Sequence, residues 1–349
     1  MTARIPLPGV AALPSIPDPH PSPRLVDSFG RVHRRLRVSV TDRCNLRCTY
    51  CMPEEVEFRP RHELLTFEEL ARVVRVAAGL GVDKVRLTGG EPLLRRGLPE
   101  LVRMVVGTPG VRDVGLTTNG LLLDQLAGPL WDAGLRRLNV SLDTLDPGRF
   151  RQLARRDGLD RVLDGLAAAR RRGFGVKVNA VALRGLVEHD AGPLAAFCRE
   201  MGFELRFIES MPIGADPWDR SQAVLADELL GLVAAACGPL LPAADDDPSA
   251  PARSYVYAVG GGRVGVIASV SRPFCGACDR LRLTADGQLR NCLFSDAEVD
   301  VKGVLRGGGG TDAAVADRLR ACVWGKAAGH GFNAAGWQPS GRTMHSIGG

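Results

Sequence analysis

Three cysteines, Cys44, Cys48 and Cys51, stand with three and then two residues between them. Thiolates are soft ligands that select zinc, copper(I) or iron–sulfur clusters. A structural zinc site takes four ligands, whereas an iron–sulfur cluster held by three thiolates keeps one iron open to a small molecule. Because three of the nine cysteines in 349 residues fall in this one short stretch, the spacing favours a cluster over unrelated core thiols.

A second group of three cysteines lies in the C-terminal part of the sequence. Cys275 and Cys278 have two residues between them, and Cys292 follows after thirteen more. Leucines on either side of Ala285-Asp286-Gly287 predict a hairpin between the last two of these cysteines. On these residues alone a structural zinc site stays open as an alternative. Its fourth ligand would be one of Cys322, His330 and His345.

The segments around the cysteines repeat as a strand, a loop and a helix. Apolar and polar residues alternate over 36–40, which predicts a strand that leads into the first cysteine group. Thr66 and Glu69 have the spacing of a capping box at the start of a helix. Further strands are expected near 83–88, 112–117, 136–142, 175–181 and 204–209, with helices near 97–106, 121–133, 160–172, 190–201 and 223–236. Repeated strand–helix units predict an α/β fold with a parallel sheet, and six of them suit an open, partial (βα)6 barrel of the TIM type.

Polar residues gather where the predicted strands end. The second strand leads into Gly89-Gly90-Glu91-Pro92, and later strands carry Thr117, Ser141, Lys177 and Met211 at or near their ends. In barrels of this kind the functional site lies at the carboxyl ends of the strands. Glycine at position 90 permits the close backbone approach that a ligand contact needs. We therefore expect a ligand site beside the first cysteine group.

Composition divides the chain into four segments. Residues 1–32 begin with seven prolines in the first 23 positions, which predicts a disordered tail. The barrel is expected over 33–242 and a linker, rich in aspartate and proline, over 243–253. The remaining segment, 254–349, would hold the second cysteine group and ends in Gly348-Gly349.

Composition and charge also exclude several classes of protein. Hydrophobic residues make up 45% of the sequence, and no run approaches the roughly 18 apolar residues of a membrane span. The N-terminus lacks the apolar core of a signal peptide, and nine cysteines suit a reducing compartment better than a disulfide framework, so we expect a cytoplasmic protein. The net charge of +6 comes from 41 arginines spread along the chain and only four lysines. We expect no nucleic-acid binding, but a minority of the arginines should bind a polyphosphate.

The first cysteine group, with the aromatic Tyr50 before its last cysteine and Gly90 after the next strand, resembles the motif of the radical S-adenosylmethionine (SAM) superfamily. This resemblance implies a cluster whose open iron chelates SAM and, after one-electron reduction, cleaves it to methionine and a 5′-deoxyadenosyl radical. With the second cysteine group, the run Arg280-Leu281-Arg282 and the terminal Gly348-Gly349, residues 34–349 resemble the GTP 3′,8-cyclases. The family implies two 4Fe–4S clusters and the conversion of GTP to 3′,8-cyclo-7,8-dihydro-GTP, the first step of molybdenum cofactor biosynthesis.

The same resemblance implies roles for individual residues. The first cluster would be held by Cys44, Cys48 and Cys51, and the second by Cys275, Cys278 and Cys292. SAM would contact Tyr50, Gly90, Ser141 and Met211. GTP would contact Arg37, Arg86, Thr117, Lys177, Arg280, Leu281 and Arg282. Gly348 and Gly349 would insert into the barrel as a catalytic tail. The chemistry agrees, because the planar guanidinium group of arginine suits phosphate oxygens.

The resemblance further implies partners and leaves alternatives. Cyclic pyranopterin monophosphate synthase would be the next enzyme, and a reductase or a flavodoxin-type protein would donate electrons; no membrane is involved, and a homodimer is compatible. A radical SAM peptide-modifying enzyme with an auxiliary cluster usually has more C-terminal cysteines, and only Cys322 is present here beyond the second group. An iron–sulfur electron carrier or a zinc-stabilised nucleic-acid module would not explain the glycine-rich strand end.

Overall fold

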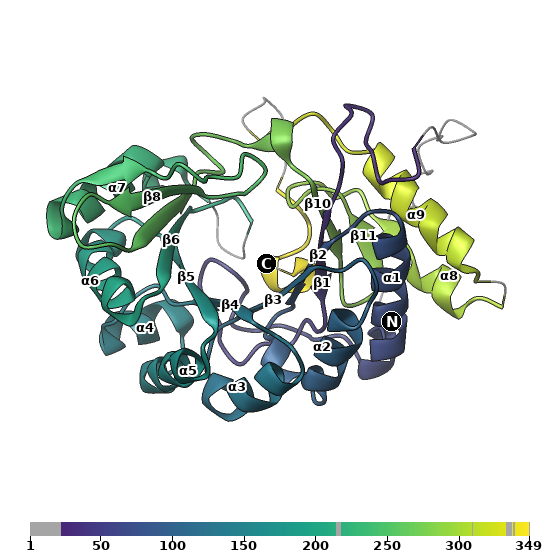
Figure 1. Ribbon diagram of the computed structural model, residues 1–349, viewed down its shortest axis with the longest axis horizontal. Coiled ribbons are helices and arrows are strands. Elements are labelled where there is room, and N and C mark those ends of the chain that lie inside the picture. The colour runs from purple at the N-terminus through teal and green to yellow at the C-terminus, as the bar shows by residue number, and fades with distance from the viewer. Residues whose placement is uncertain (1–21, 214–217, 309, 333–336, 338, 349) are drawn as a thin grey trace, which may run out of the picture.

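The computed structural model describes residues 22–213, 218–308, 310–332, 337 and 339–348. The strands of these residues form one sheet in the order β12-β11-β10-β1-β2-β3-β4-β5-β6-β9-β8-β7. The sheet curves into an open arc, with most of the helices on its outer side and the last described residues inside it (Figure 1). The predicted α/β class and the partial barrel are confirmed.

Six parallel strands and their helices form the barrel. The strands are β1 (Arg35–Ser39), β2 (Lys84–Thr88), β3 (Asp113–Thr118), β4 (Arg137–Ser141), β5 (Gly175–Ala182) and β6 (Glu204–Glu209). The helices are α1 (Phe67–Gly79), α2 (Leu98–Val106), α3 (Leu123–Asp132), α4 (Pro147–Ala154), α5 (Leu159–Arg172), α6 (Val187–Met201) and α7 (Ala226–Cys237). Each strand pairs in parallel with the next, so their carboxyl ends lie along the same edge of the sheet.

Helix α1 shows why these segments fold locally. The Thr66 hydroxyl accepts a hydrogen bond from the Glu69 N–H at 3.2 Å, and the Glu69 carboxylate accepts one from the Thr66 N–H at 2.7 Å. This predicted capping box satisfies backbone donors that a helix start leaves without partners. Leu70, Val73 and Ala77 then bury one face of the helix in the core.

Strand β1 turns its charged residues into the barrel and its apolar residues outward. Leu36 and Val38 are fully buried in the main hydrophobic core. Arg35 and Arg37 line the central cavity instead. Successive residues of a strand point to opposite faces, so the period of two that predicted the strand also decides which residues reach the cavity.

The C-terminal region extends the barrel sheet at both edges, which the sequence did not predict. At one edge β9 (Arg263–Ile267) pairs in parallel with β6, followed by β8 (Arg253–Tyr257) and β7 (Leu240–Pro242). At the other edge β10 (Arg280–Leu283) pairs in parallel with β1, followed by β11 (Gln288–Arg290) and β12 (Val299–Asp300). The hairpin expected between Cys278 and Cys292 is present, formed by β10 and β11 as part of this sheet. Helices α8 (Lys302–Arg306), α9 (Asp312–Trp324) and α10 (Met344–Ile347) follow.

The tail was expected to extend to residue 32, but residues before 33 are already packed against the barrel. Leu25 is fully buried, and its N–H donates to the Leu80 carbonyl at 3.1 Å. Asp27 is 2% exposed and pairs with both Arg31 and His33. Residues 24–32 are thus part of the folded barrel, because one buried leucine and one buried aspartate tie them to it. Residues 1–21 of that prediction lie outside the described part of the chain.

Two further segments depart from the predictions. The expected linker 243–253 is tied to the barrel, because Asp245 pairs with Arg263 and Asp247 with Arg35. Helix α4 was not predicted, since its eight residues are too few to show a clear apolar period; the Asp146 side chain caps it by accepting from the Arg149 N–H at 2.7 Å. No helix in the described part of the chain is long and apolar enough to cross a bilayer.

Candidate active site

The two cysteine groups lie at opposite ends of the barrel and face one cavity. The loop with Cys44, Cys48 and Cys51 follows the carboxyl end of β1, whereas Cys275 and Cys278 directly precede β10. Because β10 runs parallel to β1, the loop before β10 lies at the amino ends of the barrel strands and the loop after β1 lies at their carboxyl ends. All six cysteines, Cys292 included, line a cavity of about 830 Å³, a size typical of ligand sites.

The first cysteine loop is packed against the glycine-rich end of β2. The Gly90 N–H donates to the Thr41 carbonyl and the Glu91 N–H to the Arg43 carbonyl, both at 2.7 Å. A Cβ atom at Gly90 would lie 2.4 Å from the Arg43 carbonyl oxygen. Glycine is therefore required here to place the cysteine loop, a reason that adds to the predicted approach of a ligand.

Glu91 joins the ends of β2 and β3 and was missed as a site residue. It is fully buried, and its carboxylate accepts from the Thr118 hydroxyl and the Asn119 N–H at 2.7 Å each. Burial raises the pKa of Glu91 to about 7. The Asn119 amide in turn donates to Asn45 at 2.8 Å, within the cysteine loop. The signal for Glu91 was present in the sequence, because it directly follows Gly89-Gly90.

The predicted SAM contacts come together around the first cysteine group. Tyr50, Gly90, Ser141 and Met211 all line the cavity. The Tyr50 hydroxyl donates to Asp143 Oδ2 at 2.7 Å, and Asp143 Oδ1 accepts from the Val181 N–H at 2.7 Å. Asp143, just after β4, therefore fixes the aromatic ring that precedes Cys51.

The second cysteine group has a cationic environment. Lys326 Nζ lies 3.3 Å from Cys278 Sγ and donates to the Arg280 carbonyl at 2.9 Å. Burial acts to raise the pKa of Cys278, but the charges of Arg280 and Lys326 outweigh it and lower the pKa to about 6. Lys326 is only 5% exposed. Sequence reasoning missed this residue, although it is one of only four lysines in the chain.

The six thiols fit the ligand set of two clusters. All nine cysteines are free of disulfides, and Cys198 and Cys322 are buried in the main core. In the described residues, no group of three or more His, Cys, Asp or Glu side chains is arranged to hold a single metal ion. A four-iron cluster takes its thiolates at different iron atoms, and Cys278 is already set up to be a thiolate, the form in which cysteine binds metals.

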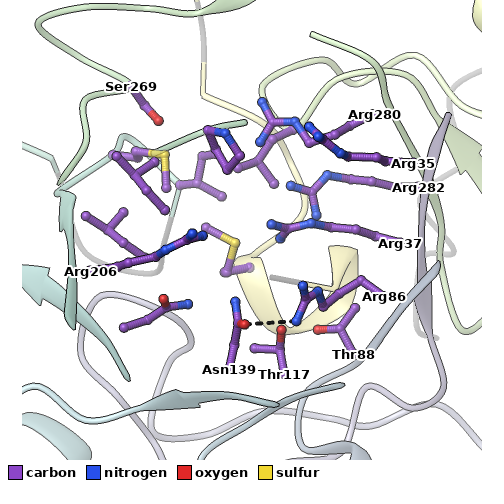
Figure 2. Close-up of a pocket in the computed structure, with 18 of the residues that line it drawn as sticks. Arg35, Arg37, Arg86, Thr88, Thr117, Asn139, Arg206, Ser269, Arg280 and Arg282 are labelled. Carbon is purple, nitrogen blue, oxygen red and sulfur yellow. Dashed lines mark hydrogen bonds between the residues drawn. The ribbon is translucent and has the colours of Figure 1, made fainter. Parts of the chain in front are cut away.

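Arginines form one wall of the cavity between the two cysteine groups. Arg37 stands directly opposite Arg86 of β2 and Arg282 of β10 in the strand register. Figure 2 shows Arg35, Arg37, Arg280 and Arg282 reaching in from this wall and Arg206 from the opposite one. Of the described residues, no carboxylate forms an ion pair with Arg37, Arg86, Arg280 or Arg282.

The lack of anionic partners shows in the pKa values of these arginines. Burial, and then the Arg282 charge, lowers the pKa of Arg37 well below its usual value. Burial, and then Arg280, lowers the pKa of Arg282 to about 9, and burial lowers that of Arg86 to about 10. Arg86 and Arg282 thus stay charged at neutral pH, at a free-energy cost that a bound polyanion would offset.

The remaining predicted GTP contacts differ in their surroundings. Thr117 lines the cavity, and so does Asn139, which accepts from Arg86 Nη1 at 2.9 Å and was missed. Lys177 also lines it, but its ammonium is paired with Glu204 at 2.5 Å. The Leu281 side chain is fully buried in the hydrophobic core. The Leu281 side chain therefore does not face the cavity, since alternate residues of β10 point away from it; a GTP contact by Leu281 stays a prediction for its backbone alone.

Gly348 lies inside the barrel, against β1 and β2. Its carbonyl accepts a hydrogen bond from Arg282 Nη1 at 2.6 Å. Its φ of +86° is a left-handed conformation, and a Cβ atom there would lie 2.9 Å from Ser39 Cβ and 3.1 Å from Thr88 Cγ2. Only glycine fits such a position without strain. Gly349, the other predicted tail residue, lies outside the described residues.

Comparison with known proteins agrees with this arrangement. The family profile described as Radical SAM superfamily matches residues 38–198, and the one described as Molybdenum Cofactor Synthesis C matches residues 203–332. GTP 3′,8-cyclase of Rhodopirellula baltica is 48% identical over 335 residues, covering 93% of this chain and 92% of that protein. GTP 3′,8-cyclase of Streptomyces coelicolor is 47% identical, covering 93% and 96%. This chain belongs to the GTP 3′,8-cyclase family. A further relative of the family, GTP 3′,8-cyclase 2 of Mycobacterium tuberculosis, is 49% identical over 93% of this chain and 92% of its own length.

Two solved structures of other proteins share the fold of this chain. SuiB of Streptococcus suis, solved bound to S-adenosylmethionine, has a TM-score of 0.52 and 15% identity over 76% of this chain. The match spans 62% of SuiB, less than two thirds of its length. Native anSMEcpe with bound AdoMet has a TM-score of 0.53 and 14% identity, covering 76% of this chain and 77% of that one. At these identities the likeness shows the fold alone, a partial barrel of the radical SAM kind.

Proposed function

We propose that this protein is a radical SAM cyclase that converts GTP to 3′,8-cyclo-7,8-dihydro-GTP, the first step of molybdenum cofactor biosynthesis. One observation carries the proposal beyond family membership. Two cysteine triads face each other across a cavity whose wall holds four arginines, Arg37, Arg86, Arg280 and Arg282, with no carboxylate partner in the described chain. Such a wall suits a nucleoside triphosphate, since the phosphates supply the missing negative charge.

The residues at each end define what they would hold. Cys44, Cys48 and Cys51 would bind one 4Fe–4S cluster, with SAM beside Tyr50, Gly90, Ser141 and Met211. Cys275, Cys278 and Cys292 would bind the second cluster on the GTP side. When bound, the first cluster and SAM would supply a 5′-deoxyadenosyl radical to take the hydrogen from C3′ of GTP. Bonding of C3′ to C8 of the guanine would then need one further electron, from the reductant, and one proton to give the dihydro product.

The contribution of the protein is positioning. Strands β10, β1 and β2 place Arg282, Arg37 and Arg86 in one row, midway between the two cysteine loops. Phosphates held by this row leave the ribose and the base between the two ends of the barrel. Holding reactants in near-attack geometry is worth several powers of ten in rate.

A peptide-modifying radical SAM enzyme is the second candidate, and the arginine wall disfavours it. A peptide has no run of phosphates to compensate four arginines, Arg282 of them buried, that have no carboxylate partner in the described chain. We further propose, from membership of the GTP 3′,8-cyclase family, a cytoplasmic enzyme that receives electrons from a reductase or a flavodoxin-type protein. Its product would pass to cyclic pyranopterin monophosphate synthase.

The test is anaerobic incubation of the reconstituted protein with SAM, a strong reductant and GTP. We expect about eight irons per chain, as two 4Fe–4S clusters require, and a product that retains the mass of GTP. Deoxyadenosine should form in equal amount. If deoxyadenosine forms but GTP is recovered unchanged, the protein is a radical SAM enzyme with another substrate. If zinc is found in place of iron at the second triad, the cyclase proposal is wrong.

A further inference from the structure

The last described residues form part of the cavity wall. Met344 and His345 of α10 line the cavity, and Ile347, 1% exposed, packs in an apolar cluster with Phe294. The Gly348 carbonyl then meets Arg282. A helix of four residues does not hold its place by itself, because helix formation is costly below several turns. Other contacts must therefore fix this segment in the barrel.

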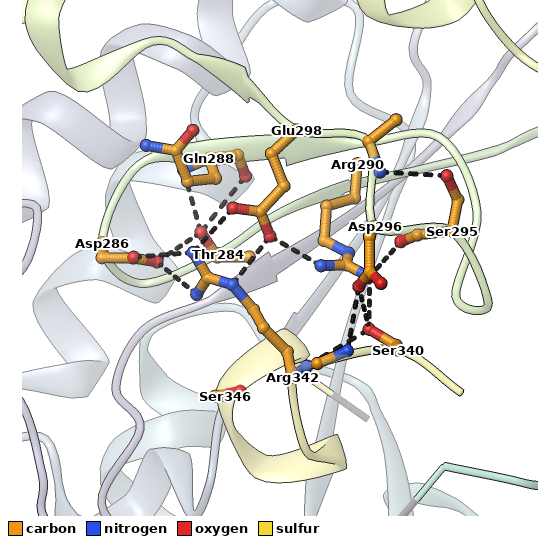
Figure 3. Close-up of polar contacts among 12 residues, drawn as sticks. Thr284, Asp286, Gln288, Arg290, Ser295, Asp296, Glu298, Ser340, Arg342 and Ser346 are labelled. Atoms are coloured by element: carbon orange, nitrogen blue, oxygen red, sulfur yellow. Dashed lines mark hydrogen bonds and ion pairs between the residues drawn. The ribbon is translucent and has the colours of Figure 1, made fainter. Parts of the chain in front are cut away.

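Arg342, two residues before α10, is held by two carboxylates (Figure 3). Its Nη1 and Nη2 donate to the two oxygens of Asp286 at 3.1 and 3.0 Å. Its Nη2 and Nε reach the two oxygens of Glu298 at 2.8 and 2.7 Å. Asp286 lies in the turn between β10 and β11, and Glu298 directly precedes β12. Two edges of the guanidinium plane are therefore each paired with one carboxylate, which is the geometry arginine favours with carboxylates.

The residues just before Arg342 are bound to the part of the chain that follows β10. The Ser340 hydroxyl donates to Asp296 Oδ1 at 2.7 Å, and the Gly341 N–H donates to the same oxygen at 3.1 Å. Arg290, whose side chain is 1% exposed, reaches Glu298 at 2.6 Å and Ser340 at 3.0 Å. Three consecutive residues before α10 are thus bound to the segment that contains β11 and Cys292 (Figure 3).

The charges in this network balance within the described residues. Arg342, Arg290 and Arg59 face Asp286, Glu298 and Asp296, and Arg59 lies 3.1 Å from Asp286. The Asp286 side chain is only 7% exposed and that of Arg342 19%. Removing one member of a buried set leaves the others without compensation. The network therefore holds one arrangement of the segment rather than several.

We propose that Arg342 is a positioning residue for the reaction: its pairs with Asp286 and Glu298 fix the C-terminal segment 340–348 on the β10–β11 hairpin and so set the place of Gly348 in the cavity. Arg282, which receives the Gly348 carbonyl, is in β10 of that same hairpin. The carboxylate of Asp286 that holds Arg342 and the Arg282 side chain that holds Gly348 therefore belong to one hairpin. The catalytic consequence rests on the proposed function, whereas the anchoring does not.

The anchoring is tested by hydrogen exchange of the protein without GTP or SAM. The Gly348 N–H donates to the Met344 carbonyl at 3.1 Å, so the C-terminal peptide should be protected in the wild type. Arg342→Ala should expose it to rapid exchange while peptides from β1 and β2 stay protected. Arg342→Lys keeps the charge but loses the planar fork and should be intermediate. Arg306→Ala is the matched control, because Arg306 also pairs with a carboxylate at two positions, 2.7 and 2.9 Å from Glu69; it should leave the C-terminal peptide unchanged.

The catalytic consequence is tested by a double-mutant cycle. Arg342→Ala and the removal of Gly348-Gly349 should each lower cyclisation by about 100-fold, the scale expected for misplaced groups. In the truncated protein Arg342→Ala should cost nothing further, because it acts only through the tail. A general loss of stability would add to the truncation instead. Iron content and the unfolding temperature are measured on every variant, and Arg342→Lys serves if Arg342→Ala does not fold.

Each outcome separates the inference from the proposed function. Unchanged exchange of the C-terminal peptide in Arg342→Ala overturns the anchoring. Changed exchange with additive losses in the cycle overturns the catalytic part. If the wild-type protein does not cyclise GTP at all, but Arg342→Ala still releases the C-terminal peptide, the proposed function fails and the anchor stands.

Discussion

Each of the two cysteine groups presents three thiols to the same cavity, but the side chains that surround the two groups differ. Around the first group burial raises the pKa of Cys44 to about 11 and that of Cys51 to about 12. The carboxyl groups of Glu91 and Asp143 act in the same direction, and the charge of Arg47 acts against them at Cys44. Around the second, Arg280 and Lys326 overcome burial and lower the pKa of Cys278 to about 6.

Under the proposed function, this difference offers a way for one barrel to sort two reactants. SAM carries a sulfonium cation, so the end with the carboxyl groups of Glu91 and Asp143 suits it. GTP carries several negative charges, so the end with Arg280 and Lys326 suits it. We propose that these charges, rather than the ligand type, decide which reactant each end takes.

Loss of a first-group cysteine should have the largest effect. With Cys48→Ala only two thiolates remain, too few to retain a cluster with one open iron. We expect deoxyadenosine formation to disappear, with or without GTP. The measurement is chromatography of deoxyadenosine after anaerobic incubation with SAM and reductant. Production at the wild-type rate would contradict the assignment of this group to SAM.

Loss of a second-group cysteine should separate the two ends. Cys275→Ala should still cleave SAM, because the first group lies at the opposite edge of the sheet, but it should neither bind GTP normally nor cyclise it. Deoxyadenosine, GTP affinity and cyclised product are measured on one preparation. A variant that makes the cyclised nucleotide normally would show that the second group is structural and would return zinc as a candidate for its metal.

Substitution of Gly348 should leave both cysteine groups able to bind iron but should displace the C-terminal segment that lies between them. Gly348→Ala meets a φ of +86° and Ser39 Cβ at 2.9 Å, so the tail must move; we expect cyclisation to fall by about 100-fold with iron content intact. Gly202→Ala is the matched control, since its φ is +71° but nothing lies within 4 Å. It should cost about 1 kcal/mol of stability and little activity. Equal losses in the two variants would refute a specific role for Gly348.

Lys326 should give the smallest and most selective effect. A cation 3.3 Å from Cys278 Sγ favours the more negatively charged, reduced state of a cluster bound there. Lys326→Met should therefore lower the reduction potential of the second cluster and leave the first unchanged, as measured by spectroelectrochemical titration. Lys302→Met is the control, because Lys302 donates to the Glu63 carbonyl instead. If the reduction potentials of both clusters shift, or if neither shifts, Lys326 does not specifically tune the second cluster.

Local patterns carried most of the fold prediction. Alternating residues located β1 and the inward-facing Arg37, the Thr66–Glu69 box located the start of α1, and the spacing of the cysteines located both groups. These signals are readable because they depend on neighbours within a few residues of each other. Helix α4 was not predicted because eight residues are too few to show an apolar period. Residues 24–32 were assigned to the tail because only a few long-range contacts, such as that of Leu25 with Leu80, hold them in the fold.

The sequence by itself determined which side chains could do chemistry: six cysteines in two triads, inward-facing arginines and a terminal glycine pair. Only the tertiary structure decided where they meet. The parallel pairing of β10 with β1 joins residues more than 240 positions apart, and that pairing puts the triads at opposite ends and turns Leu281 into the core. Packing of the chain after α9 places Lys326 beside Cys278, and Arg342 meets Asp286 and Glu298 from a distant part of the chain. Register between distant strands leaves no local pattern, because it is set by how the whole sheet buries its apolar face.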